Sequence, residues 1–468
     1  MEPADIDRAD IDRADTDRAD TDRADTDRAD TDRADTDRAD TDRADTDITG
    51  LDLTDLDLFG TGNPHEAFRS LRDRAPLFWN DEADGNKGFW SVTRYDDVAA
   101  VDKDAATWSS EQQVTLEELD EEQLLVRKSM IDTDGARHWA LRKLLVREFS
   151  PRAVALYEDF LTQLTGATLD RALALGEFDF VDEISADIPI RLLARMLDVP
   201  VDDTDKLIDW GNQMIANSDP DYTDVLAGSP ESEQYRNLPF RSPAALEVFE
   251  YGFRLAAQRK GGTGTDLVSK LVNTTPEDGV PLSDLDYQNY FSLLIIAGNE
   301  TTRHTISHTV RALATHPQAW ADLKADPSLV QNAVEEFLRW ATPILHFRRT
   351  ATRDVELHGQ TIREGDKLVM WFGSANFDER KFENPYVFDV HRKNVEHVSF
   401  GKGSPHFCLG NALARLEIKI VITALLERLE RIELLSEPTM VRSNLVHGIK
   451  KMPVRVHPDP AYRGADAR

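Results

Sequence analysis

The longest helical pattern in the chain runs over residues 285–316, where apolar residues recur at helical spacing. Pro281 precedes this segment, Ser283 can cap its first turn, and Pro317 stops it. About 30 residues rising 1.5 Å each would span roughly 45 Å. The pattern therefore predicts one helix that crosses the whole molecule.

Shorter periodic segments surround this helix. Helical spacing dominates over residues 105–345, and a strongly amphipathic helix is expected at 409–430. Alternating apolar and polar residues predict strands at 76–81, 88–98 and 354–376. The expected fold class is therefore mostly α with a smaller β-sheet region, that is α+β.

The first 50 residues have a different pattern, a five-residue repeat of the form ADTDR or ADIDR. Eight complete units run from Ala4 to Arg43. A period of five matches neither a helix face nor a strand face. A pentapeptide solenoid is the alternative, but its central Leu is replaced here by Thr or Ile. We expect residues 1–50 to be a disordered acidic tail and 51–468 to form a single domain.

The composition excludes several classes of function. The net charge of −31 disfavours direct binding of nucleic acid. No run of about 18 apolar residues is present, so no membrane span is expected. The acidic N-terminus does not resemble a signal peptide. A single cysteine excludes an internal disulfide and suits a reducing compartment, so we expect a cytoplasmic protein. We also expect it to be a monomer.

That cysteine, Cys408, lies in the glycine-rich stretch SFGKGSPHFCLGN at 399–411. It could be an inert, buried residue, since free cysteine often packs as a small apolar side chain. It could be a nucleophile with His406 as its base, although no third partner is recognisable. It could also be a thiolate ligand, because backbone N–H groups and the following helix would stabilise the thiolate. One thiolate without other soft ligands suits axial ligation of haem iron.

The segment FGKGSPHFCLGNALAR resembles the cysteine-ligand loop of the cytochrome P-450 superfamily of haem-thiolate monooxygenases. Phe400, Gly403, Cys408 and Gly410 occupy the characteristic positions. Four residues separate Gly403 from Cys408, whereas the usual form has three. The longer loop is similar to bacterial members that oxidise sterol side chains, branched lipids and terpenes.

Two further motifs match the same family in order. Glu336 and Arg339 in EEFLRW form Glu-x-x-Arg and lie one helical turn apart. By resemblance, Arg392 in FDVHR completes a buried salt-bridge cluster with them. The stretch AGNETT at 297–302 matches the oxygen-activating part of the long helix. Taken alone, these motifs could be a surface ion pair and a hydroxyl bonded to its own helix.

A third group of residues is assigned to the cofactor by the resemblance. His138 and Arg142 in RHWALR lie four apart on one helix face. With Arg349 and His406, they are expected to hold the two propionates of haem b, because partly buried carboxylates need several donors. Taken alone, the His138–Arg142 pair would be a solvated face.

The resemblance implies that haem lies between the long helix and the helix after Cys408. Cys408 is then the iron ligand, with Phe400 and Gly410 beside the cofactor. Ala297 and Gly298 leave room above the iron. Thr301 and Glu300 are the expected catalytic residues, which hold water and relay protons.

A hydrophobic small molecule (a sterol, a terpenoid or a branched fatty chain) is the expected substrate, which receives one oxygen atom from O2. The expected pocket wall consists of Leu293, Ile296, Ala297 and Leu345. The segment 109–130 and the Pro- and Ser-rich stretch 218–241, expected to be a mobile loop, should form a lid.

Electrons should come from a separate ferredoxin-type protein with an NAD(P)H-dependent reductase. Lys143, Arg147 and Lys402 could form its docking patch. Within the class, a peroxide-driven enzyme is the alternative. From another class, a haem-based sensor or binder remains possible, although a proton relay argues against it.

Overall fold

The computed structural model describes residues 47–82 and 86–462, which belong to one compact unit that begins at Thr46. Residues 1–46 of the expected repeat tail lie outside the described residues. Ile48, which falls within the expected tail, packs against a buried cluster that includes Leu53 and Phe59.

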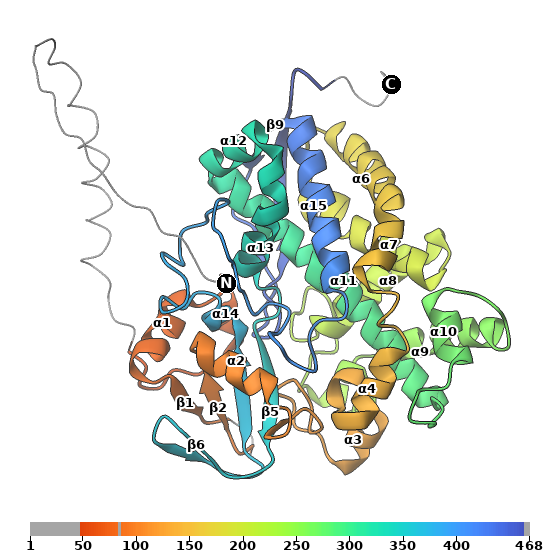
Figure 1. The fold of residues 1–468 in the computed structure, drawn as a ribbon, viewed down its shortest axis with the longest axis vertical. Coiled ribbons are helices and arrows are strands. Elements are labelled where there is room, and N and C mark those ends of the chain that lie inside the picture. The colour runs from red at the N-terminus through yellow and green to blue at the C-terminus, as the bar shows by residue number, and fades with distance from the viewer. Residues whose placement is uncertain (1–46, 83–85, 463–468) are drawn as a thin grey trace, which may run out of the picture. The chain divides into compact units, whose positions relative to one another are not determined.

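Fifteen α-helices are present in the described residues (Figure 1). They are α1 (His65–Arg74), α2 (Tyr95–Lys103), α3 (Glu121–Val126), α4 (Gly135–Lys143), α5 (Pro151–Val154), α6 (Glu158–Leu173), α7 (Asp187–Leu197), α8 (Thr204–Ile215), α9 (Ala244–Arg259), α10 (Leu267–Asn273), α11 (Asp284–Thr315), α12 (Pro317–Ala325), α13 (Val330–Ala341), α14 (Phe372–Ala375) and α15 (Asn411–Arg428). None of the helices in 47–82 and 86–462 is long and apolar enough to cross a membrane.

Twelve strands form four small sheets in the same part of the chain. The strands are β1 (Leu77–Asn80), β2 (Phe89–Val92), β3 (Trp108–Ser109), β4 (Glu177–Asp179), β5 (His346–Ala351), β6 (Val355–Leu357), β7 (Gln360–Ile362), β8 (Lys367–Trp371), β9 (Leu429–Leu434), β10 (Thr439–Met440), β11 (Ile449–Lys451) and β12 (Pro453–Pro458). The largest sheet has the order β1-β2-β8-β5-β3, and the others are β4-β12-β9, β10-β11 and β6-β7. The expected α+β class is confirmed.

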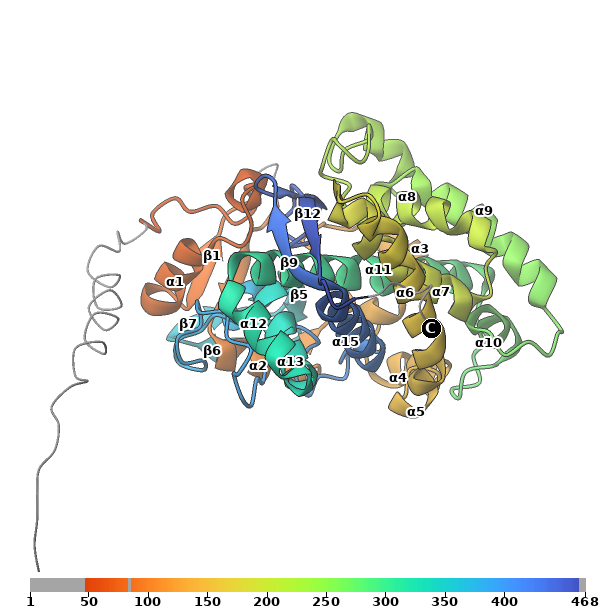
Figure 2. The ribbon, with the colours of Figure 1, turned by 90° about the horizontal axis from the view of Figure 1, so that it is seen from above.

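The long helix α11 is the central element of the described unit. Its first turn is closed by a capping box in which Ser283 and Asp286 bond each other's backbone. Apolar residues such as Tyr290, Phe291 and Ile306 are buried along its length. Figure 2 shows α15 on one side of α11 and α8 and α9 on the other, and all three helices pack against it. The predicted bounds 285–316 differ from the observed ones by one residue at each end.

The large sheet joins distant parts of the chain. β2 pairs in parallel with β8, so that Trp90 lies opposite Leu368, while β5 pairs antiparallel with β8. The predicted strand at 88–98 is only half right, because β2 ends at Val92 and α2 begins at Tyr95. Asp96 and Asp97 favour a helix start, and the backbone N–H of Tyr95 donates to the side chain of Asp378.

Candidate functional site

One stripe of α11 remains accessible although most of the helix is buried. Leu293, Ala297 and Thr301 follow one another at intervals of one turn, and all three are partly or fully exposed. The hydroxyl of Thr301 donates to the carbonyl oxygen of Ala297 at 3.0 Å. This stripe is the part of the central helix that can face a ligand.

Two residues that the sequence assigns to this region make close packing contacts. Ile296 is only 5% exposed and belongs to the main apolar core. A Cβ atom on Gly298 would lie 3.3 Å from two methyl carbons of Leu193 in α7. The absence of a side chain at Gly298 therefore allows close packing of α11 on α7.

The loop before α15 holds Cys408 from several directions. The Cys408 N–H donates to the Phe400 carbonyl at 2.8 Å, and the Asn411 side chain donates to the Cys408 carbonyl at 2.8 Å. Gly401 and Gly403 have φ angles of +75° and +70°, which favour glycine. The turn that returns the chain to Cys408 therefore depends on these two glycines.

The thiol of Cys408 lies in a mixed electrostatic environment. Burial prevails and raises its pKa, and the backbone N–H of Gly410 and the charges of Arg142 and Arg415 offset only part of this rise. The hydrogen bond from Gly410 and the two guanidinium groups favour the anionic sulfur, which is the form that binds a metal.

Four nitrogen-bearing side chains converge beside this loop. His138 and Arg142 come from α4, and the Arg142 Nη2 donates to the Phe407 carbonyl at 2.6 Å. The rings of His138 and His406 have centroids 4.1 Å apart. Arg349, on β5, is 3% exposed, and its Nη2 lies 3.1 Å from Asp102 Oδ1.

Carboxylates accompany these groups, and the sequence did not indicate them. Asp134 lies 3.0 Å from Nε2 of His406 and accepts from the backbone N–H of Ser110. Asp102 is 5% exposed and accepts from Lys402 N at 3.3 Å as well as from Arg349. Neither Asp102 nor Asp134 belongs to a recognisable motif. Their partners Arg349 and His406 lie more than 200 positions away in sequence, so only the fold brings each pair together.

Glu300 is completely buried beside the accessible stripe. Its carboxylate lies 2.5 Å from Nη2 of Arg303 and 3.5 Å from Nε2 of His304. Burial alone would raise its pKa, but the charge of Arg303 prevails and the pKa is lowered. Arg303 also donates to Asn212 in α8 at 2.7 Å. Glu300 is therefore a charged group in an ion pair that faces α8.

A second buried carboxyl group lies on the α15 side of α11. Glu417 is 1% exposed, and burial raises its pKa to about 8 despite a hydrogen bond from the Thr302 side chain. Its Oε1 has no hydrogen-bond partner among the described residues. This group is protonated at neutral pH, whereas Glu300 is ionised. Sequence reasoning missed it, because Glu417 reads as one polar position of an amphipathic helix.

The Glu-x-x-Arg motif forms a buried ion pair with a third member. Arg339 lies 2.7 Å from Glu336, and Arg392 lies 3.0 Å from the same carboxylate. Arg339 also donates to the carbonyls of Asn376 and Pro385 at 2.8 and 3.0 Å. The cluster thereby connects α13 to the irregular segment before the Cys408 loop.

Leu345 is 1% exposed and packs in the cluster that contains Phe59, Phe68 and Trp371. Its side chain belongs to this buried cluster. The adjacent Ile344 is partly exposed and contacts two other apolar clusters.

The two segments expected to form a lid are joined by charges. Glu117 lies 2.6 Å from both Arg127 and Arg241, and Arg236 pairs with Asp120. The stretch 218–241, predicted as a loop, contains two short 3-10 helices, Pro230–Tyr235 and Pro239–Arg241. We use the name lid network for the five charged residues Glu117, Asp120, Arg127, Arg236 and Arg241.

The described residues fit the haem that the sequence leads us to expect. Cys408 supplies a soft ligand, and Arg142 and Arg349 supply permanent positive charge for two carboxylates. His406 Nδ1 is buried without a partner in the described part of the chain. The accessible stripe on α11 provides a surface of small and apolar groups. The donor set therefore suits an iron macrocycle with two acidic arms.

Comparisons with known proteins agree with this chemistry. Residues 254–452 match the family model described as Cytochrome P450. A steroid C26-monooxygenase of Rhodococcus jostii is 35% identical over 401 residues, which are 84% of this chain and 81% of that protein. A methyl-branched lipid omega-hydroxylase of Mycobacterium bovis is 34% identical over 400 residues, 83% of this chain and 90% of that protein.

The fold has close counterparts among solved structures. A Mycobacterium marinum cytochrome P450 in complex with pseudoionone superposes with a TM-score of 0.77 and 36% sequence identity. The match covers 83% of this chain and 94% of that one.

Proposed function

The chain belongs to the cytochrome P450 family, and on this premise we propose that Cys408 is the iron ligand of a monooxygenase that acts on sterol-like or branched lipid-like molecules. Haem is the cofactor of this family, and the activity is insertion of oxygen into a hydrophobic substrate. The observation that carries the assignment of Cys408 is its thiol, which accepts from Gly410 N–H and lies near Arg142 and Arg415.

Haem bound through a thiolate activates O2 and supplies the oxidising power for attack on a C–H bond. The chain supplies the charges around it. Arg142, Arg349, His138 and His406 would hold the two propionates, which are otherwise costly to bury. Phe400 and Gly410 would lie beside the cofactor, because both contact the ligand residue through its backbone or sulfur.

We assign proton delivery to Thr301 and Glu300. The Thr301 hydroxyl donates to Ala297 O within the helix, and a rotation of its side chain would free it to hold a water. Glu300 would accept a proton and pass it on if Arg303 Nη2 releases it while Nη1 keeps its bond to Asn212. Both movements are local, and neither requires α11 to unfold.

The substrate would lie against Leu293, Ala297 and Thr301, under the lid network. The accessible side of α11 is small and apolar there, which favours a hydrophobic molecule over a charged one. The names of the relatives point the same way, since one acts on a steroid and another on a methyl-branched lipid. Gly298, Ile296 and Leu345 would shape this space through packing.

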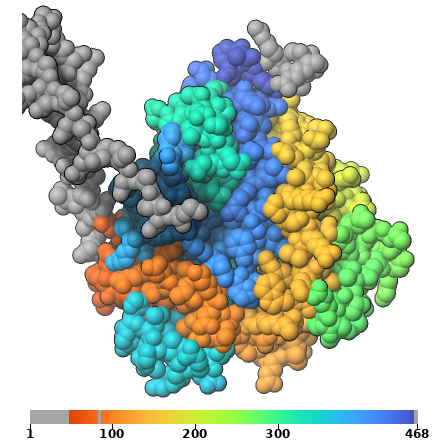
Figure 3. Space-filling model, viewed as in Figure 1, coloured from red at the N-terminus to blue at the C-terminus, as the bar shows by residue number. Residues whose placement is uncertain are grey.

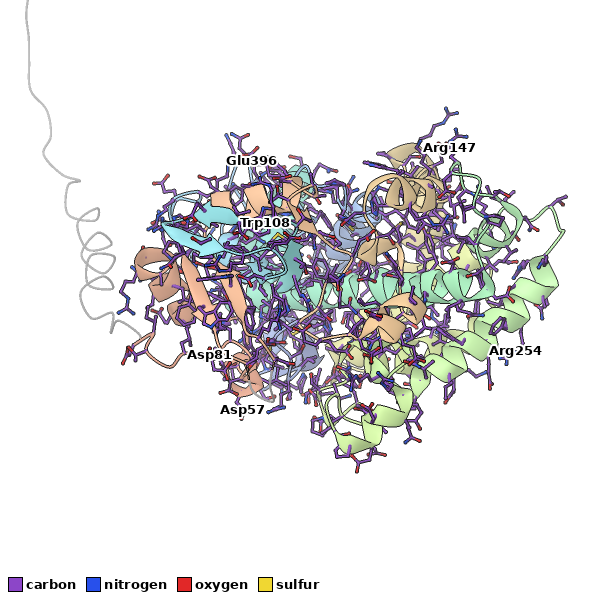
Figure 4. The ribbon with its side chains drawn as sticks, turned by 90° about the horizontal axis from the view of Figure 1, so that it is seen from below. Asp57, Asp81, Trp108, Arg147, Arg254 and Glu396 are labelled. Carbon is purple, nitrogen blue, oxygen red and sulfur yellow. The ribbon has the colours of Figure 1, made fainter. Side chains whose placement is uncertain are left out.

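We propose that a separate ferredoxin, reduced by an NAD(P)H-dependent reductase, delivers the electrons. Of the three expected docking residues, Lys143 pairs with Glu277 and Lys402 with Glu396, whereas Arg147 pairs with none of the described acids. Figure 4 shows Arg147 and Glu396 projecting from the same side of the molecule. Trp139 and Val146, close to Arg147 in sequence, are 47% and 38% exposed. We assign docking to this apolar and basic surface.

We further propose that residues 51–468 act as one catalytic domain and that the protein is a cytoplasmic monomer. The compact unit supports the first part of this proposal, because it contains every residue assigned to the site. Analytical ultracentrifugation at several protein concentrations would reveal a dimer.

Replacement of Cys408 by Ser tests the central assignment. The reduced carbon monoxide complex of the parent should show the red-shifted absorption of thiolate ligation, and Cys408→Ser should lose it. Difference spectra with sterols, terpenoids and branched fatty acids then identify the substrate class. A thiolate spectrum that persists in the variant would refute the assignment.

A further inference from the structure

Arg415 forms a two-pronged ion pair close to the proposed iron ligand. It lies on α15, two turns after Cys408, and its Nε and Nη2 donate to the two carboxylate oxygens of Glu335 in α13 at 2.6 and 2.9 Å. Such paired bonds fix the plane of the guanidinium group. Figure 3 shows α15 (blue) at the surface between α13 (teal) and α6 (yellow).

The same guanidinium contacts the Cys408 loop in two places. Its central carbon lies 4.7 Å from the ring centroid of Phe400, within the range of a cation–π contact. Its Nη1 donates to Asn411 Oδ1 at 3.0 Å, and Asn411 in turn donates to the Cys408 carbonyl. Phe400 accepts the Cys408 N–H through its own carbonyl. Arg415 is therefore connected to both backbone groups of Cys408.

Glu335 has another partner that keeps it in place. His397 is buried, and its Nδ1 accepts from the Ser399 N–H at 3.2 Å, so Nε2 carries the proton. That Nε2 lies 3.2 Å from Glu335 Oε2. Burial would raise the pKa of Glu335, but His397 and Arg415 hold it at about 2. The carboxylate therefore stays charged at all working pH values.

We propose that Glu335 and Arg415 are positioning residues that set the reduction potential of the haem iron through Cys408 and Phe400. The inference rests on the proposed role of Cys408 as ligand. Reduction adds negative charge to the iron–thiolate unit, and a nearby guanidinium stabilises that charge. The carboxylate of Glu335 acts in the opposite sense, and it also holds Arg415 over the Phe400 ring.

Partial exposure limits the size of the effect but not its sign. The side chains of Arg415 and Glu335 are 30% and 29% exposed, so water screens their outer atoms. The inner side of the guanidinium faces the ring of Phe400, which covers it on that side. Opposite effects of the two charges distinguish this role from a purely structural one, because loss of either partner would loosen the loop in the same way.

The experiment measures the midpoint potential of the holoenzyme by spectroelectrochemical titration. Arg415→Gln should lower the potential and Glu335→Gln should raise it. The double variant should lie between the two single variants, and Arg415→Lys between the parent and Arg415→Gln. Arg428→Gln, on the same helix but paired with Asp170, is the matched control and should leave the potential unchanged.

Haem content and the carbon monoxide spectrum are recorded for every variant. If Arg415→Gln loses haem, Arg415→Lys and Glu335→Gln still carry the test. Potentials that move in the same direction for both charges, or that stay at the parent value, overturn the proposal. Loss of the thiolate spectrum in the parent protein would instead overturn the role of Cys408, so the two failures are distinguishable.

Discussion

Glu300 and Thr301 are neighbours in the chain, yet Glu300 is completely buried in an ion pair with Arg303 while Thr301 remains accessible. Consecutive residues of a helix point about 100° apart, so one faces α8 and the other lies on the open stripe. Any proton that moves between them must cross the surface of α11. In the proposed relay, Glu300 would hold the proton and Thr301 would deliver it.

Replacement of Thr301 by Ala should uncouple electron flow from product formation. The variant lacks the hydroxyl that we propose holds a water, so more peroxide and severalfold less product per NAD(P)H consumed are expected. Simultaneous assays of NAD(P)H, peroxide and product provide the measurement. Thr301→Ser keeps the hydroxyl and is the control. Equal coupling in Thr301→Ala and the parent would assign the role to another group.

Glu417→Gln should change how stability depends on pH. Burial raises the pKa of Glu417 from its ordinary value of 4.5 to about 8. Between these values the folded protein keeps a proton that the unfolded chain releases, so the contribution to stability is complete below about pH 4.5 and is lost as the pH rises through about 8. The Gln variant lacks this decline.

Thermal unfolding of the Glu417→Gln variant and the parent at several pH values tests this expectation. Above pH 8 the Gln variant should be more stable than the parent by a few kcal/mol. Glu427→Gln, an exposed position on the same helix, is the control. Parallel pH profiles for Glu417→Gln and the parent would show that Glu417 does not retain its proton.

Arg236→Gln should loosen the lid network. Arg236 pairs with Asp120, and its carbonyl also accepts from the Gln123 side chain. Hydrogen exchange at 117–127 and 230–241 should become severalfold faster in the variant. The parent should behave similarly in about 1 M NaCl, where the screening length falls to roughly 3 Å. Arg431→Gln removes an exposed ion pair in β9 and should leave both segments unaffected. Unchanged exchange in Arg236→Gln would mean that the Arg236–Asp120 ion pair does not hold these segments together.

Deletion of residues 2–46 should leave haem content and turnover intact, because the repeat has almost no apolar side chains with which to join a core. A deletion that extends to residue 53 should lower stability. It removes Ile48, which contacts a buried cluster, and Leu53, which belongs to that cluster. Thermal unfolding of both truncated proteins provides the measurement. A large loss of haem in the shorter deletion would contradict the expectation.

The sequence predicted the elements that depend on local pattern. α11 and α15 are long segments without an internal proline, and α11 also has a clear cap, so their approximate bounds follow from neighbouring residues. The strong amphipathic pattern expected for α15 is not observed, because apolar side chains lie on several of its faces. The start of α2 was missed, because an aromatic residue after a strand pattern reads as more strand. Its actual start depends on Asp378, far away in the chain.

Site residues could be predicted where a sequence motif identifies them. They could not be predicted where their role depends on packing between separate elements. Cys408 and Glu336 lie in segments whose spacing is distinctive. Asp102, Glu417 and the Arg415–Glu335 pair acquire their roles only through contacts between separate elements. Ile296 and Leu345, assigned to the pocket from sequence, are part of buried apolar clusters, a packing that the sequence does not reveal.

The parallel pairing of β2 with β8 has a consequence for synthesis of the protein. Trp90 donates to Asp366 across 276 positions of sequence. At roughly 5–20 residues per second, a ribosome needs on the order of 15 to 60 seconds to supply the second partner. β2 therefore cannot pair with β8 until that time has passed, and Cys408 is synthesised later still. Cofactor capture through this residue should accordingly be one of the last events of biogenesis, so a shortage of haem would leave a chain that is nearly complete but still lacks its iron.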